Sequence, residues 1–241
     1  MNFKINAMGD SSIIINLSSK INLDIHLKIK GLCRYLDQHP FEGMIEYVPA
    51  FTTLTIFYDP FRVIEASSEK TLKSPFTLLK EKLQNILNKI DLQIEDRPRI
   101  VEIPVCYDEE FGPDLDFVAK HNNLSPEEVI DIHCKFENRV YMIGFAPGFP
   151  YLAGMSEKIA APRRKTPRLS IPEGSVGIAG NQTGVYSIST PGGWQLIGKT
   201  PLKLFNTKNE NPSLLSSGDI IRFKSISKKE YYEIEALEES M

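Results

Sequence analysis

The stretch that decides the fold class is Gly174-Ser-Val-Gly-Ile-Ala-Gly-Asn-Gln-Thr-Gly-Val-Tyr-Ser-Ile-Ser-Thr-Pro-Gly-Gly-Trp-Gln-Leu-Ile-Gly198, which contains seven glycines and no charged residue. Short β-branched or aromatic runs between turn-forming residues are typical of a barrel or a sandwich of short strands. The pattern extends outward, since residues 135–205 hold 10 of the 15 glycines and 7 of the 16 prolines. We therefore expect this part of the chain to be all-β.

The N-terminal half alternates strand and helix patterns. Apolar residues at 3–7 and 13–17 flank the turn Gly9-Asp10 and predict a hairpin. A helical spacing follows over 21–36 and ends before Pro40. A second hairpin is expected over 45–58, and Ser74-Pro75 predicts the start of a helix that runs to Ile90. The order ββαββα predicts a small sheet with two helices on one face.

A polar segment ending in Pro98 marks the boundary that we predict, with domains over residues 1–92 and 98–241. A strand beginning at Ile100 and two short helices should open the second domain. The second helix has a clear start, because Ser125-Pro-Glu-Glu128 is a capping box with proline at the first helical position. The expected class is α+β.

Composition excludes several classes of protein. The chain has 241 residues and a net charge of −3, so charge gives no argument for binding nucleic acid. The uncharged stretches 140–156 and 174–198 are interrupted by proline and glycine, so we expect no membrane span. Three cysteines cannot all pair within one chain, which predicts a reducing, cytoplasmic location.

Two loops could carry chemistry. The aromatic loop (residues 144–154) reads Gly-Phe-Ala-Pro-Gly-Phe-Pro-Tyr-Leu-Ala-Gly, and its rings either plug one end of a barrel or line a ligand site. The basic loop (residues 161–168) is either a solvated turn or an anion-binding segment, because prolines stiffen it and arginine binds carboxylates in bidentate fashion. Residues 135–205 as a whole hold nine basic and three acidic residues, a net charge of +6. The candidates from these loops are Pro147, Gly148, Phe149, Tyr151, Arg163, Arg164 and Arg168.

The glycine-rich stretch adds polar candidates, because amides and hydroxyls along strands can fill a barrel or line a pocket for a small polar ligand. They are Asn181, Gln182, Thr183, Gly192, Gly193 and Trp194. The lone Trp194 is more typical of a core anchor than of a stacking platform.

One apparent nucleotide motif is set aside. Residues 193–200 match the phosphate-loop pattern GxxxxGK[ST], but Pro201 follows Thr200, and the alternation of Trp194, Gln195, Leu196 and Ile197 predicts a strand that continues into 202–205. The four histidines show no metal-binding spacing, and we expect His133 to interact with a helix end. No metal site, catalytic nucleophile or phosphate cradle is predicted.

Taken together, Gly144-Phe-Ala-Pro-Gly-Phe-Pro-Tyr-Leu152, Pro162-Arg, Pro167-Arg, the run 171–184 and Ser189-Thr-Pro-Gly-Gly-Trp-Gln-Leu-Ile-Gly-Lys-Thr-Pro201 resemble the family of 5-oxoprolinase B subunits, also called KipI or allophanate hydrolase subunit 1. Gly9-Asp10-Ser11 resembles the N-terminal hairpin of that family. The resemblance covers nearly the whole chain.

The resemblance implies a small ferredoxin-like α/β domain followed by a cyclophilin-like β-barrel. It also implies a KipA-type partner known as the C subunit, a third component known as the A subunit, and ATP as the co-substrate of the complex that opens 5-oxoproline to glutamate. Two other functions remain open at this point. Some members resemble inhibitors of a sporulation sensor histidine kinase, and the related modules of urea carboxylase point to urea-derived amides. Prolyl isomerase activity by fold analogy is weak, because fold does not fix function.

Overall fold

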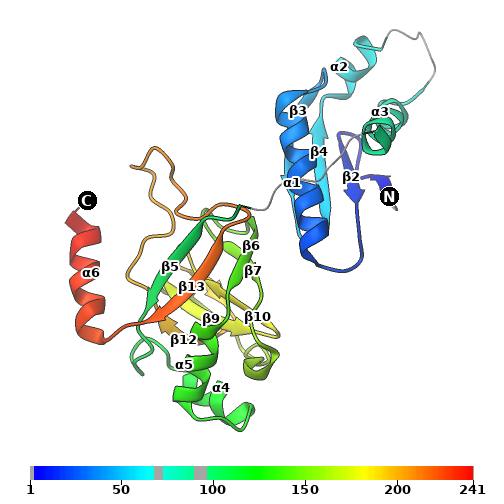
Figure 1. Cartoon of the computed structure of the whole chain (residues 1–241). Helices are drawn as coiled ribbons and strands as arrows, with labels where there is room; N and C mark the ends of the chain where they lie inside the picture. The colour runs from blue at the N-terminus through cyan, green and yellow to red at the C-terminus, as the bar shows by residue number, and fades with distance from the viewer. Residues whose placement is uncertain (1–2, 68–72, 90–96, 241) are drawn as a thin grey trace. The chain divides into compact units, whose positions relative to one another are not determined.

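The computed structural model describes residues 3–67, 73–89 and 97–240. It divides into two compact units, an N-terminal unit (residues 1–97) and a C-terminal unit (residues 98–241), which we describe separately. Both sheets and α-helices are present, which is consistent with the expected α+β class (Figure 1).

The strands described in the N-terminal unit form an antiparallel sheet in the order β1-β2-β4-β3. Both predicted hairpins are present. Every second residue of β4 is buried, as expected for a strand with one face against a core. The strands are β1 (Lys4–Ala7), β2 (Ser12–Asn16), β3 (Met44–Pro49) and β4 (Thr53–Tyr58).

The described residues of this unit also form the helices α1 (Leu23–Gln38), α2 (Pro60–Glu65) and α3 (Pro75–Lys89). Helix α1 begins later than the apolar spacing predicts, because the Asn22 side chain caps it by accepting a hydrogen bond from the Ile25 amide at 2.9 Å. The Ser74 cap of α3 is confirmed by its 3.2 Å bond from the Thr77 amide. The predicted end of this helix at Ile90 lies outside the described residues, and the short α2 was not predicted.

Apolar side chains from α1, α3 and one face of the sheet form the core of the N-terminal unit. The fully buried members include Ile13, Ile15, Leu32, Leu36, Leu54, Ile56 and Leu83.

The strands described in residues 98–240 form three sheets. The first has the order β5-β13-β6-β7, with β5 and β13 parallel and side by side (Figure 1). The second has the order β10-β9-β12, and the third pairs β11 with β8. The strands are β5 (Ile100–Val105), β6 (Asn138–Ile143), β7 (Pro150–Ala153), β8 (Arg168–Ile171), β9 (Ser175–Ala179), β10 (Gln182–Val185), β11 (Thr190–Gly192), β12 (Gln195–Lys199) and β13 (Ile220–Ser225).

Isolated bridges join Cys106 to Lys199 and Ala161 to Gly180, but the described strands do not pair into a closed barrel. Short strands are therefore present within residues 135–205 as expected, without the closed barrel that the family resemblance implies. The predicted continuation of the Trp194 strand into 202–205 is wrong. Strand β12 ends at Lys199, because Pro201 has no amide to continue a ladder.

Helices α4 (Leu115–His121), α5 (Pro126–Lys135) and α6 (Lys228–Ser240) belong to this unit, with a short 3-10 helix, η1 (Glu157–Ile159). The predicted capping box is confirmed at the start of α5. Helix α6 was not predicted.

No helix in the described part of the chain is long and apolar enough to cross a membrane. The core of the unit joins α4 and α5 to the sheets, and its members include Ile103, Val118, Val129, Val140, Val176, Ile178 and Ile221.

Candidate functional site

The aromatic loop closes the β6–β7 hairpin in a fixed conformation. The Gly144 amide donates to the Phe149 carbonyl at 3.1 Å, and the Phe149 amide donates to the Ala146 carbonyl at 3.0 Å. Phe145 has a φ of +68°, which is uncommon for a bulky residue, and its side chain is 69% exposed. The loop thus holds one ring outward and buries another, Phe149.

Phe149 is the centre of an aromatic cluster. Its ring makes edge-to-face contacts with Phe145 and Tyr151, both at 5.4 Å between centroids, and with Tyr186 and Trp194 at 5.9 and 6.2 Å. Such geometry adds to the free energy gained by burial of the rings. The rings of the aromatic loop therefore pack together and also form the wall of a hollow.

This hollow, the aromatic pocket, has a volume of about 310 Å³. Its lining combines rings with one guanidinium, one side-chain amide and glycine backbone, a combination suited to a small anionic ligand that also carries an apolar part. Burial raises the pKa of Tyr186, so its phenol stays neutral near pH 7. The lining residues are Phe145, Phe149, Tyr151, Arg163, Gln182, Tyr186, Pro191, Gly192, Gly193 and Trp194.

Arg163 is the basic-loop arginine that lines the pocket, and its backbone is fixed on both sides. The Pro162 carbonyl accepts from Gln195 Nε2 at 2.9 Å, and the Arg164 amide donates to the Gly193 carbonyl at 2.7 Å. Among the residues that the structure describes, no carboxylate forms an ion pair with Arg163. Its guanidinium is therefore available to an anion.

Arg164 and Arg168 are placed differently, since both contact the buried carboxylate of Asp114. Arg164 Nη1 lies 2.8 Å from Asp114 Oδ1, while Arg168 contacts both carboxylate oxygens at 2.9 Å. Neither arginine is among the pocket-lining residues given above. The structure thus separates the three arginines, which the sequence groups together.

Thr183 lies in a buried polar chain instead of in the pocket. Its hydroxyl donates to the Gly177 carbonyl at 3.2 Å and accepts from His133 Nε2 at 2.8 Å, while His133 Nδ1 accepts from the Tyr107 hydroxyl at 2.7 Å. His133 also stacks on Phe223 at 4.3 Å. The expected role of His133 at a helix end is wrong, because its ring is fully buried between these partners.

The other candidates surround the pocket or lie away from it. Pro147 and Gly148 belong to the aromatic loop but not to the lining, and Gly148 has a φ of +74°. Asn181 is exposed in the turn between β9 and β10. The structure therefore brings together Phe149, Tyr151, Arg163, Gln182, Gly192, Gly193 and Trp194.

Sequence reasoning did not select Phe145, Tyr186 or Pro191 as site residues. Tyr186 directly follows β10, and no pattern in the sequence separates it from an ordinary core aromatic. Pro191 was visible beside Gly192, but only the folded β8–β11 pair shows that it borders the hollow.

Residues 193–200 do not fit a nucleotide phosphate. The Lys199 amide already donates to the Cys106 carbonyl, and the Thr200 amide to the Gly174 carbonyl, both at 2.9 Å. The Lys199 ammonium lies over the rings of Tyr231 and Phe111, 5.6 and 6.0 Å from their centroids. A phosphate loop needs free backbone amides at the start of a helix, so the match of residues 193–200 to the phosphate-loop pattern does not mark a nucleotide site.

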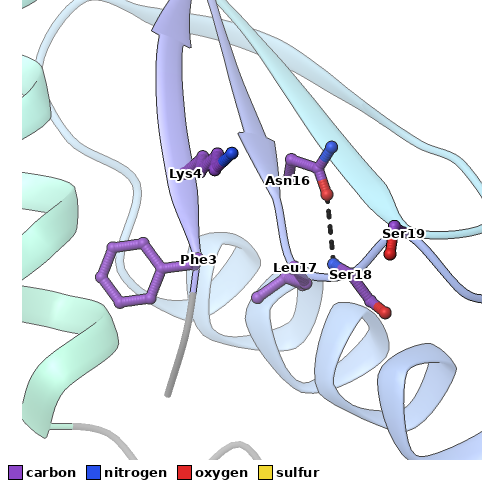
Figure 2. Close-up of a pocket in the computed structure, with 6 residues that line it drawn as sticks. All are labelled: Phe3, Lys4, Asn16, Leu17, Ser18 and Ser19. Carbon is purple, nitrogen blue, oxygen red and sulfur yellow. Dashed lines mark hydrogen bonds between the residues drawn. The ribbon is translucent and has the colours of Figure 1, made fainter.

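A larger hollow of about 480 Å³ lies in the N-terminal unit, at the ends of β1 and β2. Figure 2 shows its lining, in which the Ser18 amide already donates to Asn16 Oδ1 at 3.1 Å. Lys4 is the only charged side chain among the described residues that line this hollow. Its chemistry is less specific than that of the aromatic pocket. The lining residues are Phe3, Lys4, Asn16, Leu17, Ser18 and Ser19.

Groups of three or more potential metal ligands are not found among the described residues. Cys33, Cys106 and Cys134 are free thiols.

Comparison with known proteins gives a consistent result. A family model described as carboxyltransferase domain, subdomain C and D, matches residues 3–215. The chain is 54% identical to the 5-oxoprolinase B subunit of Bacillus subtilis (strain 168), over 95% of each chain. It is 37% identical to the 5-oxoprolinase B subunit of Escherichia coli O157:H7, over 90% of this chain and 93% of that one.

Among solved structures, TTHA0988 superposes with a TM-score of 0.75 at 33% identity, over 90% of this chain. The present chain spans about 40% of the length of that one. The urea carboxylase of Kluyveromyces lactis has the same fold over 97% of this chain and 22% of its own, with a TM-score of 0.75 at 18% identity.

Proposed function

Because this chain belongs to the family of the carboxyltransferase domain, subdomain C and D, we propose that it is the B subunit of a 5-oxoprolinase. The observation that carries the proposal is the similarity to named B subunits over nearly the whole chain. The proposed complex opens 5-oxo-L-proline to L-glutamate with a KipA-type C subunit and an A subunit, and uses ATP. Because the chain's own phosphate-loop match does not fit a nucleotide, we assign ATP to a partner protein of the complex.

The aromatic pocket suits this substrate. 5-Oxoproline is a five-membered lactam with one carboxylate, so the Arg163 guanidinium can bind the carboxylate and the Gln182 amide can bond the lactam group. The rings of Phe149 and Trp194 can pack against the methylene groups and exclude water. A charge-assisted bond of this kind contributes about 1.5–3 kcal/mol.

The same pocket lacks the groups for the chemical step. Ring opening breaks the amide C–N bond, adds the oxygen of water to the carbonyl carbon and leaves a free amine. Such a reaction needs a base to activate water and charge stabilisation at the carbonyl oxygen. The described lining residues include no carboxylate, histidine, cysteine or serine. We propose that this chain binds and orients the substrate, and that a partner supplies the base.

The two units also support the expected folds, with domain limits of 1–92 and 98–241. The antiparallel order β1-β2-β4-β3 is that of a ferredoxin-like βαββαβ sheet whose last strand has moved to the start of the chain. The short strands and bridges of the C-terminal unit support a cyclophilin-like fold. A cytoplasmic location remains part of the proposal and agrees with the three free thiols.

The test measures ATP-dependent release of glutamate from 5-oxoproline, by this chain alone and by the complex purified with the A and C subunits. We expect activity only in the complex. Arg163→Gln should raise the KM for 5-oxoproline by about tenfold or more, because the charge-assisted bond is lost. Lys165→Gln, two residues further along the exposed side of the basic loop, is the matched control and should leave KM unchanged.

Glutamate release by the chain alone would contradict the proposal that this chain binds the substrate and a partner supplies the base. A stable complex that acts on urea-derived amides and not on 5-oxoproline would assign the chain to the related urea pathway enzymes instead.

A further inference from the structure

Asp114 occupies an unusual position for a buried carboxylate. It immediately precedes α4 as the N-cap residue, yet its side chain makes no capping hydrogen bond to that helix. An aspartate at this position ordinarily accepts bonds from the first helical amides. The carboxylate is only 7% exposed, so it needs other partners to offset the loss of water.

Those partners come from two distant segments. The guanidinium groups of Arg164 and Arg168 contact the carboxylate at 2.8–2.9 Å, and the Leu196 amide of β12 donates to Asp114 Oδ2 at 2.7 Å. The Asp114 amide in turn donates to the Leu196 carbonyl at 2.9 Å. One carboxylate therefore ties the basic loop to the start of α4 and to the strand that follows Trp194.

The position of Arg163 follows from these contacts. On one side it is followed by Arg164, whose guanidinium binds Asp114 and whose amide donates to the Gly193 carbonyl. On the other side it is preceded by Pro162, whose carbonyl accepts a hydrogen bond from Gln195. Because the backbone is hydrogen-bonded on both sides of Arg163, the Cα atom of Arg163 is held at the edge of the aromatic pocket. Less conformational entropy is then lost when a ligand carboxylate binds.

We propose that Asp114 is a positioning residue for substrate binding, which holds Arg164 and Arg168 so that the pocket presents the Arg163 guanidinium to the carboxylate of the ligand. This inference rests on the proposed function of the pocket as the 5-oxoproline site. Arg164 and Arg168 then act through Asp114 and do not contact the substrate.

The main experiment compares Asp114→Asn with Asp116→Asn, an exposed aspartate in the first turn of α4, in the full complex. Loss of the Asp114 charge should raise the KM for 5-oxoproline by about tenfold and change kcat by less than about threefold, because only the binding of the carboxylate is disturbed. Asp116→Asn should change neither constant. If Asp114→Asn lowers kcat and leaves KM unchanged, Asp114 does not position the substrate.

Limited proteolysis with trypsin tests the anchor without reference to activity. In the isolated chain, cleavage after Lys165 should be at least about fivefold faster in Asp114→Asn than in the wild type, because the basic loop opens more often. Arg163→Gln should leave that cleavage rate unchanged and still raise KM. An unchanged cleavage rate in Asp114→Asn would show that Asp114 does not hold the loop.

A milder variant covers the case in which Asp114→Asn does not fold. Arg164→Gln removes one contact and keeps the Arg168 pair, so it should shift KM and cleavage in the same direction by smaller factors. If neither measurement changes in Arg164→Gln, the proposal is overturned. An inactive wild-type complex would reject the proposed function, whereas the proteolysis result would still decide whether Asp114 anchors the loop.

Discussion

Gly148 illustrates how a single residue constrains the aromatic loop. Its φ of +74° lies in the left-handed region, and a Cβ atom added there would come within 2.9 Å of the Leu204 carbonyl oxygen and of the Phe205 Cβ. Glycine is thus required for two reasons, backbone conformation and space. The sequence indicated the first, because glycine follows proline in a loop, but the second depends on a segment more than 50 residues away.

We expect Gly148→Ala to lower the free energy of unfolding by about 2–4 kcal/mol, since it adds a steric clash with backbone to the cost of a positive φ. Gly180→Ala is the matched control. Gly180 has a φ of +60° with no atom within 4 Å of an added Cβ, so this substitution should cost only about 1 kcal/mol. Urea denaturation measures both values. Equal losses would mean that the contact with Leu204 and Phe205 does not limit the loop.

The arginines show the limit of prediction at the residue scale. Composition and stiffening prolines identified the basic loop, and Arg163 does line the pocket. The partner of Arg164 and Arg168 lies 50 and 54 residues away, at a position that the sequence marks only as an acidic residue before a helix. No local pattern could assign these guanidinium groups to a buried carboxylate.

At the scale of elements, local signals predicted the start of two helices. The Ser74 cap and the Ser125 capping box are short-range patterns, and both are present in the structure. The Asn22 cap is equally local but was not predicted, so the start of α1 was placed too early. Helix α6 has such a signal that the sequence analysis did not use, because the Ser227 amide donates to Glu230 Oε2 at 2.8 Å and the Glu230 amide donates to Ser227 Oγ at 3.3 Å, which is a capping box. The helix buries little apart from Tyr231 and leaves Tyr232 and Leu237 exposed. Its apolar periodicity is therefore weak, and contacts with Phe111 and Lys199 place it instead.

Helix α5 carries the buried His133, which gives the protein a pH dependence. Burial lowers the pKa of His133 to about 3, below its usual value of 6.5. The unfolded chain therefore binds a proton below about pH 6.5 that the folded chain does not bind. Stability should fall as pH decreases through this range, by up to about 1.4 kcal/mol per pH unit.

Urea denaturation between about pH 7 and about pH 5 tests this expectation, with His133→Gln as the variant that cannot titrate. Its stability should depend less steeply on pH than that of the wild type, although its stability at neutral pH is lower. If His133→Gln keeps the wild-type slope, His133 is not the group responsible.

At the scale of the whole molecule, each unit has a hydrophobic core of its own. A polar segment that ends in Pro98 is the local signal from which the sequence predicts a domain boundary. The sequence did not predict how the described C-terminal strands divide into three sheets, because the pairings of β13 with β5 and with β6 join residues far apart in the chain. The order β5-β13-β6-β7, in which the last strand lies inside the sheet, has no local signature.

We expect residues 1–97 and 98–241 to fold as separate fragments, because each unit encloses its own apolar core. Each fragment should show a cooperative thermal transition by circular dichroism and dispersed amide signals by nuclear magnetic resonance. The absence of a cooperative transition in either fragment, with the intact chain folding normally, would show that the two units depend on each other.

Strand β13 has a consequence for protein synthesis. It pairs with β5, which lies about 120 residues earlier, and it also pairs with β6, so it separates two strands that would otherwise present open edges. While the chain leaves the ribosome, β5 and β6 must wait until residues 220–225 emerge before this sheet can be completed. A nascent chain that stalls at residue 215, where the family match ends, would expose both edges to neighbouring chains and would be prone to aggregation.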